Sequence, residues 1–170
     1  MPYELAQVNI GRLVAPVDDL RLEPFMAALD PVNALADAAP GFVWRLQTED
    51  GNATGVQAFE WDVAGTAGVI MNMSVWVDVD HLARFVYGEP HRAVMRHRRE
   101  WFVLMREAYM ACWWVRAGER PTTGAAEQRI RHLRTHGPTP HAFTLREHFP
   151  APDAGGAEPI LGQDDWLCPA

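Results

Sequence analysis

Residues 69–77 constrain the fold more than any other part of the sequence, because they form a predicted strand with two unlike faces. Successive side chains of a strand point to opposite sides of a sheet. One side of this strand is wholly apolar and carries Val69, Met71, Met73, Val75 and Val77. The other side carries Ile70, Asn72, Ser74 and Trp76. Solvent on that side would leave the large apolar area of Trp76 in water, so we expect both faces to be covered, one by helices and the apolar one by the sheet of a partner subunit.

The order of the predicted strands and helices indicates an α+β fold. The strands lie at residues 3–12, 42–47, 56–61, 69–77 and 110–116, and the helices at 20–39 and 78–108. The second and third strands are expected to form a hairpin, because turn-forming residues lie between them. The order strand, helix, hairpin strands, helix, strand is ferredoxin-like, with an antiparallel sheet and two helices that cover one face.

Proline and glycine mark the points at which both helices are expected to break. Pro31 lies inside the first helical pattern, where a proline removes a backbone donor and clashes with the preceding turn. Gly88 and Pro90 lie inside the second helical pattern. We therefore expect the second helix to stop there, to restart at His91 and to run to about Ala108.

One domain is expected to span residues 1–150 of the 170, with 118–150 as a helical C-terminal extension. Within the extension, 124–136 carries a thin apolar stripe at helical spacing, and 143–145 is typical of a short edge strand. Residues 151–170 are rich in Gly, Pro, Ala and Asp, which predicts a flexible tail.

Composition excludes several classes of function. The net charge of −7 argues against nucleic acid as a partner, and the absence of lysine excludes Schiff-base and Walker-type phosphate chemistry. No run of about 20 apolar residues or secretion signal is present, so we expect a cytoplasmic protein with no membrane partner. The histidines form no two-histidine motif with an acidic third ligand, so no metal site is predicted. Cys112 is expected in the core and Cys168 in the tail.

The helix restarting at His91 is expected to face the sheet across a small-molecule pocket. An apolar stripe shares the face of His91, namely Val94, Met95, Arg98, Phe102 and Met105. On the first strand Gln7 and Asn9 share one side, and the pattern leaves open whether that side is also the side of Asn72. The imidazole of His91 is a candidate haem ligand or general base, and the alternative, which a single histidine on an apolar face favours, is a helix-start residue bonded to a carbonyl.

Several short stretches resemble a known group of proteins, the dimeric α+β barrel superfamily of antibiotic-biosynthesis-monooxygenase type, and within it domain of unknown function 3291. The resemblance covers about residues 3–150, and its most specific stretches are residues 41–46, 74–76, 98–102, 113–115 and 136–138. It implies that the ferredoxin-like sheet pairs into a dimeric α+β barrel, and therefore a homodimer. It implies no particular reaction.

Two characterised branches of the superfamily suggest which residues to examine. Quinone-forming monooxygenases, which use no cofactor, look like this chain at Asn72 and Trp76, although Leu82 lies about where they have a tyrosine. Haem-degrading monooxygenases resemble it at Asn9, Trp76 and a helix histidine, for which His91 is the nearest candidate. The spacing from Trp76 to His91 is longer than in that branch. The resemblance therefore implies either no cofactor or haem.

The leading hypothesis is a monooxygenase-type enzyme for a flat, apolar, phenol-like or quinol-like substrate. Its predicted catalytic residues are Asn72, Trp76 and His91, and its predicted substrate contacts are Gln7, Asn9, Ser74, Met95, Arg98 and Phe102. The Asn72 amide would hold a developing phenolate oxygen, while Trp76 would exclude water and pack on the substrate. The alternatives are a haem-binding protein with His91 as ligand and a non-catalytic module that binds or sequesters a metabolite.

Overall fold

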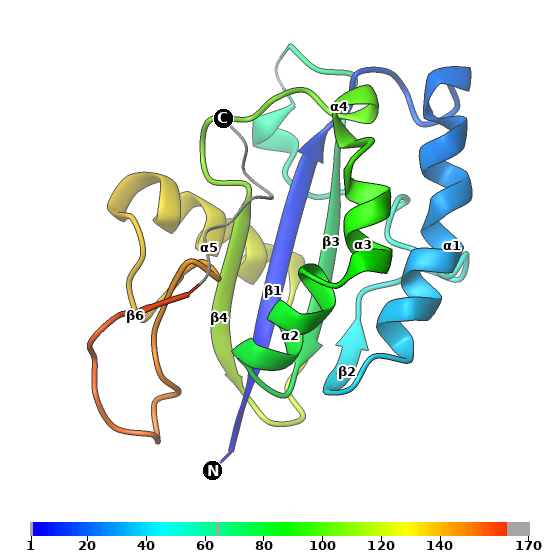
Figure 1. Cartoon of the computed structure of the whole chain (residues 1–170). Helices are drawn as coiled ribbons and strands as arrows, with labels where there is room; N and C mark the ends of the chain where they lie inside the picture. Colours follow the sequence, from blue (N-terminus) through cyan, green and yellow to red (C-terminus); the bar gives the residue numbers. More distant parts are fainter. Residues whose placement is uncertain (1, 64, 163–170) are drawn as a thin grey trace.

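The centre of the fold is a four-stranded antiparallel sheet in the order β2-β3-β1-β4 (Figure 1). The computed structural model describes residues 2–63 and 65–162. The strands are β1 (Tyr3–Arg12), β2 (Phe42–Arg45), β3 (Val69–Trp76) and β4 (Met110–Arg116). The α+β class and the antiparallel sheet are confirmed, and the chain passes through them in the βαββαβ order.

One face of the sheet is covered by helices from two parts of the chain (Figure 1). These are α1 (Glu23–Asp37), preceded by the 3-10 turn η1 (Leu20–Leu22), and α2 (Val79–Val86), α3 (Glu89–Met95) and α4 (Arg98–Trp101). The expected break at Pro31 is wrong, because α1 runs through it. Pro31 is exposed, so the carbonyl that loses its partner lies on the side of the helix next to water.

The second helical region ends earlier than the sequence predicts. It does break at Gly88, but α3 begins at Glu89 rather than His91, and after α4 the chain is extended up to β4 rather than helical to Ala108. A hydrogen bond to the end of β1 competes with the helix, because the Val103 N–H donates to the Arg12 carbonyl at 2.8 Å. Tertiary hydrogen bonds thus replace those of the predicted last helical turns.

Residues 56–61 do not form the predicted third strand. Phe59 has a left-handed backbone (φ 59°), and Glu60–Asp62 form the 3-10 turn η2. The Glu127 carboxylate accepts the Phe59 N–H at 2.7 Å and the Trp61 indole N–H at 3.1 Å. This long-range contact holds the segment away from the sheet, and β2 pairs directly with β3.

The apolar face of the sheet is buried within the single chain. Met71, Met73 and Val75, which were assigned to a subunit contact, are at most 5% exposed. Helix α5 (Thr123–His136) lies on this side, behind β1 and β4 in Figure 1, with its buried residues Ala126, Ile130 and Leu133. The expectation that a partner's sheet covers this face is therefore wrong, because the chain's own C-terminal extension occupies the position.

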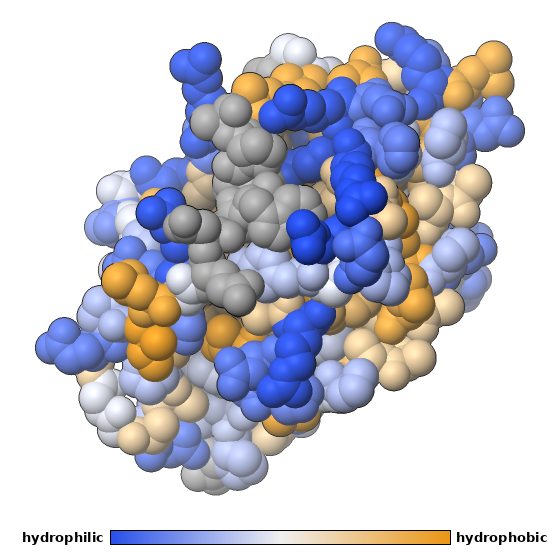
Figure 2. Space-filling view, viewed as in Figure 1, coloured by the Kyte–Doolittle hydropathy of each residue, from blue (hydrophilic) through white to orange (hydrophobic). Residues whose placement is uncertain are grey.

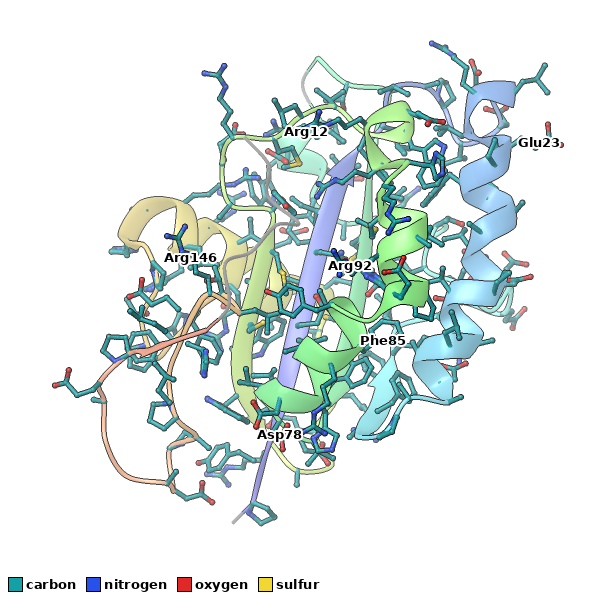
Figure 3. All side chains as sticks on the ribbon, in the orientation of Figure 1. Arg12, Glu23, Asp78, Phe85, Arg92 and Arg146 are labelled. Atoms are coloured by element: carbon teal, nitrogen blue, oxygen red, sulfur yellow. The ribbon has the colours of Figure 1, made fainter. Side chains whose placement is uncertain are left out.

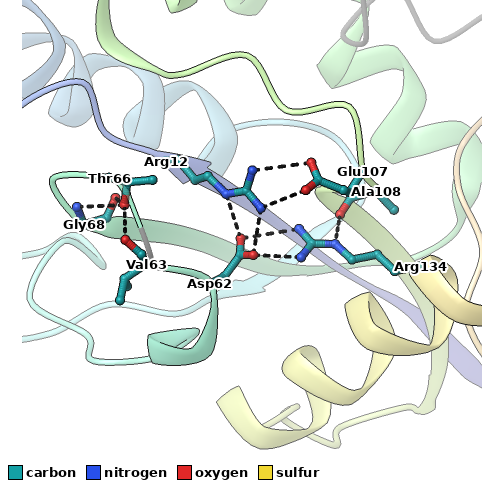
Figure 4. Close-up of polar contacts among 8 residues, drawn as sticks. All are labelled: Arg12, Asp62, Val63, Thr66, Gly68, Glu107, Ala108 and Arg134. Atoms are coloured by element: carbon teal, nitrogen blue, oxygen red, sulfur yellow. Dashed lines mark hydrogen bonds and ion pairs between the residues drawn. The ribbon is translucent and has the colours of Figure 1, made fainter.

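An ion-pair network ties the extension to the sheet (Figure 4). The Asp62 carboxylate, 8% exposed, lies 2.8 Å from both the Arg12 and the Arg134 guanidinium groups, and Arg12 also pairs with Glu107. Burial alone would raise the pKa of Asp62, but the hydrogen bonds from Arg134 and Arg12 outweigh it and hold the pKa below its ordinary value. The network joins β1, η2 and α5.

The segment after α5 runs along the other edge of the sheet. Phe143 exchanges both backbone hydrogen bonds with Cys112 of β4, so the predicted edge strand is reduced to one bridge. Cys112 is fully buried, as predicted. Strand β5 (Glu147–His148) pairs with β6 (Ile160–Leu161), which lies in the predicted tail. Cys168 falls outside the described residues, and no helix in the described part is long and apolar enough to cross a bilayer.

Candidate functional site

A cavity of about 190 Å³ lies between the sheet and the four covering helices. It is lined by all nine predicted site residues, namely Gln7, Asn9, Asn72, Ser74, Trp76, His91, Met95, Arg98 and Phe102. The outer surface over α2, α3 and α4 is mostly hydrophilic, and hydrophobic residues show between α3 and α1 (Figure 2). The predicted polar face of β3 is therefore the floor of the cavity.

A ladder of side-chain hydrogen bonds crosses this floor. Gln7 is paired with Ser74 in the β1-β3 register, so the side of Gln7 is the side of Asn72, a point that the sequence left open. The Gln7 side-chain N–H groups donate to Asn72 Oδ1 at 3.0 Å and to Ser74 Oγ at 3.1 Å. Trp76 Nε1 donates to the same hydroxyl at 2.9 Å. The ladder connects four of the predicted residues.

The ladder fixes the orientation of the Asn72 amide. Because Asn72 Oδ1 accepts from Gln7, the other end of the amide, Nδ2, carries two N–H donors. Nδ2 has no hydrogen-bond partner among the described residues, and the Asn72 side chain is exposed although it lies in mid-strand. Asn72 therefore offers preorganised donors to a ligand oxygen.

Trp76 is a wall of the cavity. It is 1% exposed, and its indole N–H is already bonded to Ser74. Its ring stacks on Phe85 at 5.1 Å and meets Phe42 edge-on at 5.5 Å. Figure 3 shows Phe85 on the side of α2 that faces the strands. Trp76 thus shapes the site and excludes water, and its polar atom is not available to a substrate.

His91 is connected to Trp76 through the ring of Phe85. Phe85 contacts both rings, with its centroid 5.1 Å from each, and so links them. His91 Nδ1 lies 3.0 Å from the Val86 carbonyl, which can only accept, so Nδ1 carries the proton and Nε2 has a lone pair. Burial lowers the pKa of His91, and the bond to Val86 opposes this only in part. The imidazole is therefore a neutral potential base.

A second aromatic cluster lies at the opposite end of the cavity, and the sequence analysis predicted only its Phe102 as a site residue. Phe25 contacts Trp101 at 5.5 Å and Phe102 edge-on at 5.2 Å. Phe102 packs onto Gly11, where a Cβ would lie 2.6 Å from its ring, so only glycine fits. Trp101 lies three residues after Arg98, and this helical spacing was the signal that could have revealed it.

Arginines provide the only formal charges on the cavity wall among the described residues. Arg45 and Arg98 line the cavity and no Asp or Glu does. Arg45 is paired with Asp37 at 2.8 Å, which compensates its charge. Arg98 donates to the Tyr109 hydroxyl at 3.1 Å and lies over the Tyr109 ring.

The volume of the cavity is small compared with haem. A cavity of about 150 Å³ encloses a single benzene ring. The present cavity, at about 190 Å³, is only slightly larger, whereas haem is a macrocycle of four pyrrole rings. Among the described residues, no group of three or more potential ligands could hold a metal ion either.

Comparison with known proteins gives the chain a family. A family model described as "Domain of unknown function (DUF3291)" matches residues 4–158. The chain belongs to the DUF3291 family. The DUF3291 match takes in α5 and β5, so the helical extension over the apolar face is part of the family's domain. No curated protein matches the chain.

One solved structure is similar to this DUF3291 protein. It is the NE2512 protein of unknown function from Nitrosomonas europaea, with 15% sequence identity and a TM-score of 0.43. The similar region covers 71% of this chain and 96% of that chain.

Proposed function

We propose that this DUF3291 protein is a monooxygenase-type enzyme that oxidises a small, electron-rich phenol without a cofactor. The observation that carries the proposal is the Gln7 to Asn72 hydrogen bond, which occupies Oδ1 of this cavity-lining residue and leaves its two Nδ2 donors without a partner among the described residues. Donors fixed in advance stabilise an oxygen that becomes negative during a reaction and do not need to reorganise. A phenol that loses its proton develops such an oxygen.

The proposed reaction is balanced without any external reductant. The phenolate gives one electron to O₂, which leaves an aryloxyl radical and superoxide. These combine, and a C–O bond forms at the ring carbon para to the phenol oxygen. The hydroperoxide loses water, so the phenol gains one oxygen atom, loses two hydrogens and becomes a quinone.

His91 is the proposed general base. Its Nε2 lone pair accepts the phenol proton, and the bond from Nδ1 to the Val86 carbonyl holds the ring and its tautomer. Because burial lowers its pKa, the imidazole is neutral and able to accept a proton at pH 7. Trp76, Phe85 and Phe42 enclose the substrate ring and exclude water.

The size of the cavity limits the substrate. A volume of about 190 Å³ suits one substituted aromatic ring, by comparison with the ~150 Å³ cavity that holds benzene. We therefore propose a monocyclic substrate and no haem. The homodimer implied by the superfamily resemblance is a separate proposal. Its two subunits would have to contact each other through a surface other than the apolar face of the sheet, because α5 covers that face.

The test is oxygen uptake by purified protein with 2-methoxyphenol and related monocyclic phenols whose para carbon carries a hydrogen. We expect turnover above the rate with heat-denatured protein, and a product that has gained one oxygen and lost two hydrogens. Asn72→Ala should lower the rate about 100-fold, which is typical for the loss of an oxyanion donor. Gln128→Ala removes an exposed amide on α5 and serves as the control. Binding without turnover would refute the enzyme and support a metabolite-binding module.

A further inference from the structure

One polar side chain interrupts the face that α1 turns toward the cavity. This face carries, at the three- and four-residue spacing of a helix, Phe25, Ala28, Leu29, Val32, Asn33 and Ala36. All of them are apolar except Asn33. An apolar side chain at this position would continue the stripe and bury more apolar area, so packing against the sheet does not explain the amide.

The Asn33 amide is buried but not bonded within the chain. The residue is 9% exposed, and its side chain has no hydrogen-bond partner among the residues that the structure describes. Neither its Oδ1 nor its Nδ2 is among the buried polar atoms of these residues that are shut off from water. Both atoms therefore reach the open space of the cavity that Asn33 lines. A polar side chain that is nine-tenths buried and unpaired is rare, and a ligand in the cavity would supply its partner.

Asn33 on the helical wall and Asn72 on the sheet lie at about the same level of the cavity. The Asp37 carboxylate near the end of α1 lies 2.8 Å from Arg45, which is paired with Ser74 in the β2-β3 register. Asn33 precedes Asp37 by four residues, ~6 Å along the helix, and Asn72 precedes Ser74 by two, ~7 Å along the strand. Because α1 and β3 run in the same direction (Figure 1), both steps lead toward the same level. A ligand between the two walls can reach both amides.

The surroundings of Asn33 indicate an uncharged ligand group. One turn further along α1, Asp37 accepts two hydrogen bonds from Arg45, whose Nη1 donates to the Gly51 carbonyl. The charge of Arg45 is therefore balanced within the protein. The Asn33 amide is itself uncharged and offers an acceptor, Oδ1, and two donors on Nδ2. A hydroxyl is the smallest uncharged group that both donates and accepts, which suits a cavity of about 190 Å³.

We infer that Asn33 is a ligand-binding residue and that the ligand carries a second hydroxyl, bound by Asn33, besides the oxygen bound by Asn72. The phenol and the role of Asn72 rest on the proposed function, whereas the contact between Asn33 and an uncharged polar group does not depend on the reaction. The second hydroxyl belongs meta to the first, because the ortho carbon lies next to Asn72 and the para carbon receives the oxygen. The substrate class is then a 1,3-dihydroxybenzene, and Asn33 determines specificity for it.

The experiment compares 1,3-dihydroxybenzene with 3-methylphenol, in which a methyl group of similar size replaces one hydroxyl. Both are titrated into nitrogen-15-labelled protein and followed by NMR. We expect the diol to bind about fivefold or more tightly, the effect of one uncharged hydrogen bond, and to shift the Nδ2 amide signals of Asn33. These signals are assigned by their loss in Asn33→Leu. The same variant should lose the preference for the diol and keep its affinity for 3-methylphenol.

Unfolding in urea without ligand separates a binding role from a structural one. If Asn33 serves binding alone, Asn33→Leu should unfold at a higher urea concentration than the unmodified protein, because it removes an unpaired amide from an apolar face. Asp30→Leu is the matched control, since Asp30 lies on the exposed side of α1, does not line the cavity and has a helix propensity similar to that of asparagine. It should gain less stability than Asn33→Leu and keep the preference for the diol.

Four results would overturn the inference: equal affinity for the two compounds, a preference that persists in Asn33→Leu, no binding of either compound, or an Asn33→Leu variant less stable than the unmodified protein. Preferred binding of the diol without oxygen uptake would remove the proposed reaction and leave the inference standing. Oxygen uptake with 2-methoxyphenol and no preference for the diol would do the reverse.

Discussion

Gln7 donates a hydrogen bond to the Oδ1 atom of Asn72 across the β1-β3 pair at 3.0 Å. Without it, the Asn72 amide would be free to present either its oxygen or its nitrogen to the cavity. With it, the nitrogen faces the cavity, and the site becomes complementary to an anionic oxygen rather than to a donor. One buried side chain outside the reaction thus determines what the reacting residue can bind.

Gln7→Leu tests this relationship. Leucine has a similar volume and cannot hold the amide, so we expect kcat for 2-methoxyphenol to fall about tenfold, which corresponds to ~1.4 kcal/mol of lost transition-state stabilisation. Unfolding in urea should show a loss of only about 1 to 2 kcal/mol, because Ser74 keeps its bond to Trp76. An unchanged kcat in a folded variant would show that Asn72 needs no fixed orientation.

The pH dependence of the rate tests His91. If its neutral imidazole is the base, kcat/KM should fall on the acid side as pH drops through the pKa of His91, which burial holds below the usual value of about 6.5. His91→Gln should lower the rate and remove this acid limb. His97→Gln is the control, since His97 is exposed between α3 and α4 and pairs with Glu100. An acid limb that persists in His91→Gln would assign the base to another group.

The same lowered pKa makes a prediction about stability. As pH falls, the unfolded chain binds a proton at His91 below about pH 6.5, whereas the folded chain binds it only at its lower pKa. The free energy of unfolding should therefore decline between about pH 6.5 and the pKa of the folded state. Below that pKa, His91 should cause no further loss. Urea unfolding of the unmodified protein and of His91→Gln at pH 7.5 and 5 gives the difference. His91→Gln should lose less stability on acidification than the unmodified protein.

Asp62→Asn tests the network that holds α5 to the sheet (Figure 4). The substitution leaves Arg12 and Arg134 close together without their shared buried counter-ion, so we expect a loss of about 3 kcal/mol in the free energy of unfolding. Asp50→Asn, in an exposed turn, should change it by less than about 0.5 kcal/mol. In the unmodified protein the contribution of Asp62 should be lost as pH falls through its lowered pKa.

Gly11→Ala tests the contact between β1 and Phe102. The new Cβ would lie 2.6 Å from the Phe102 ring, so the ring must move toward the cavity, and we expect a loss of about 1 to 3 kcal/mol in stability. Gly124→Ala is the matched control, because nothing lies within 4 Å of its Cβ position on α5. A Gly11→Ala variant as stable as the control would show that Phe102 is not held against the sheet.

The candidate site could be predicted because its residues follow local periods. Asn72, Ser74 and Trp76 share a face through the two-residue period of a strand, and His91, Met95 and Arg98 share one through helical spacing. The helix breaks between α3 and α4, yet Met95 on α3 and Arg98 on α4 both line the cavity, whereas Met105, beyond the end of α4, does not. Local spacing was therefore a reliable guide to the wall on which a residue lies.

The errors arise where a distant residue competes with a local preference. Residues 56–61 have the composition of a strand, but Glu127, 68 positions after Phe59, binds their backbone in another conformation. The helix predicted to reach Ala108 ends at Trp101, because Arg12 on β1 takes the next backbone donor. Neither contact can be predicted from the amino-acid pattern of the segment whose conformation it changes.

The sequence alone determines the α+β class, the faces of the strands and helices, and the residues that line the cavity. Only the tertiary structure decides that α5 rather than a partner covers the apolar face, that Phe85 contacts both Trp76 and His91, and that the Asn72 amide turns its nitrogen to the cavity. Backbone geometry sets the direction of the side chains along one strand or helix, so these directions can be predicted from the spacing of residues that are close in the sequence. Which elements meet, and which atoms bond there, depends on residues far apart in the chain.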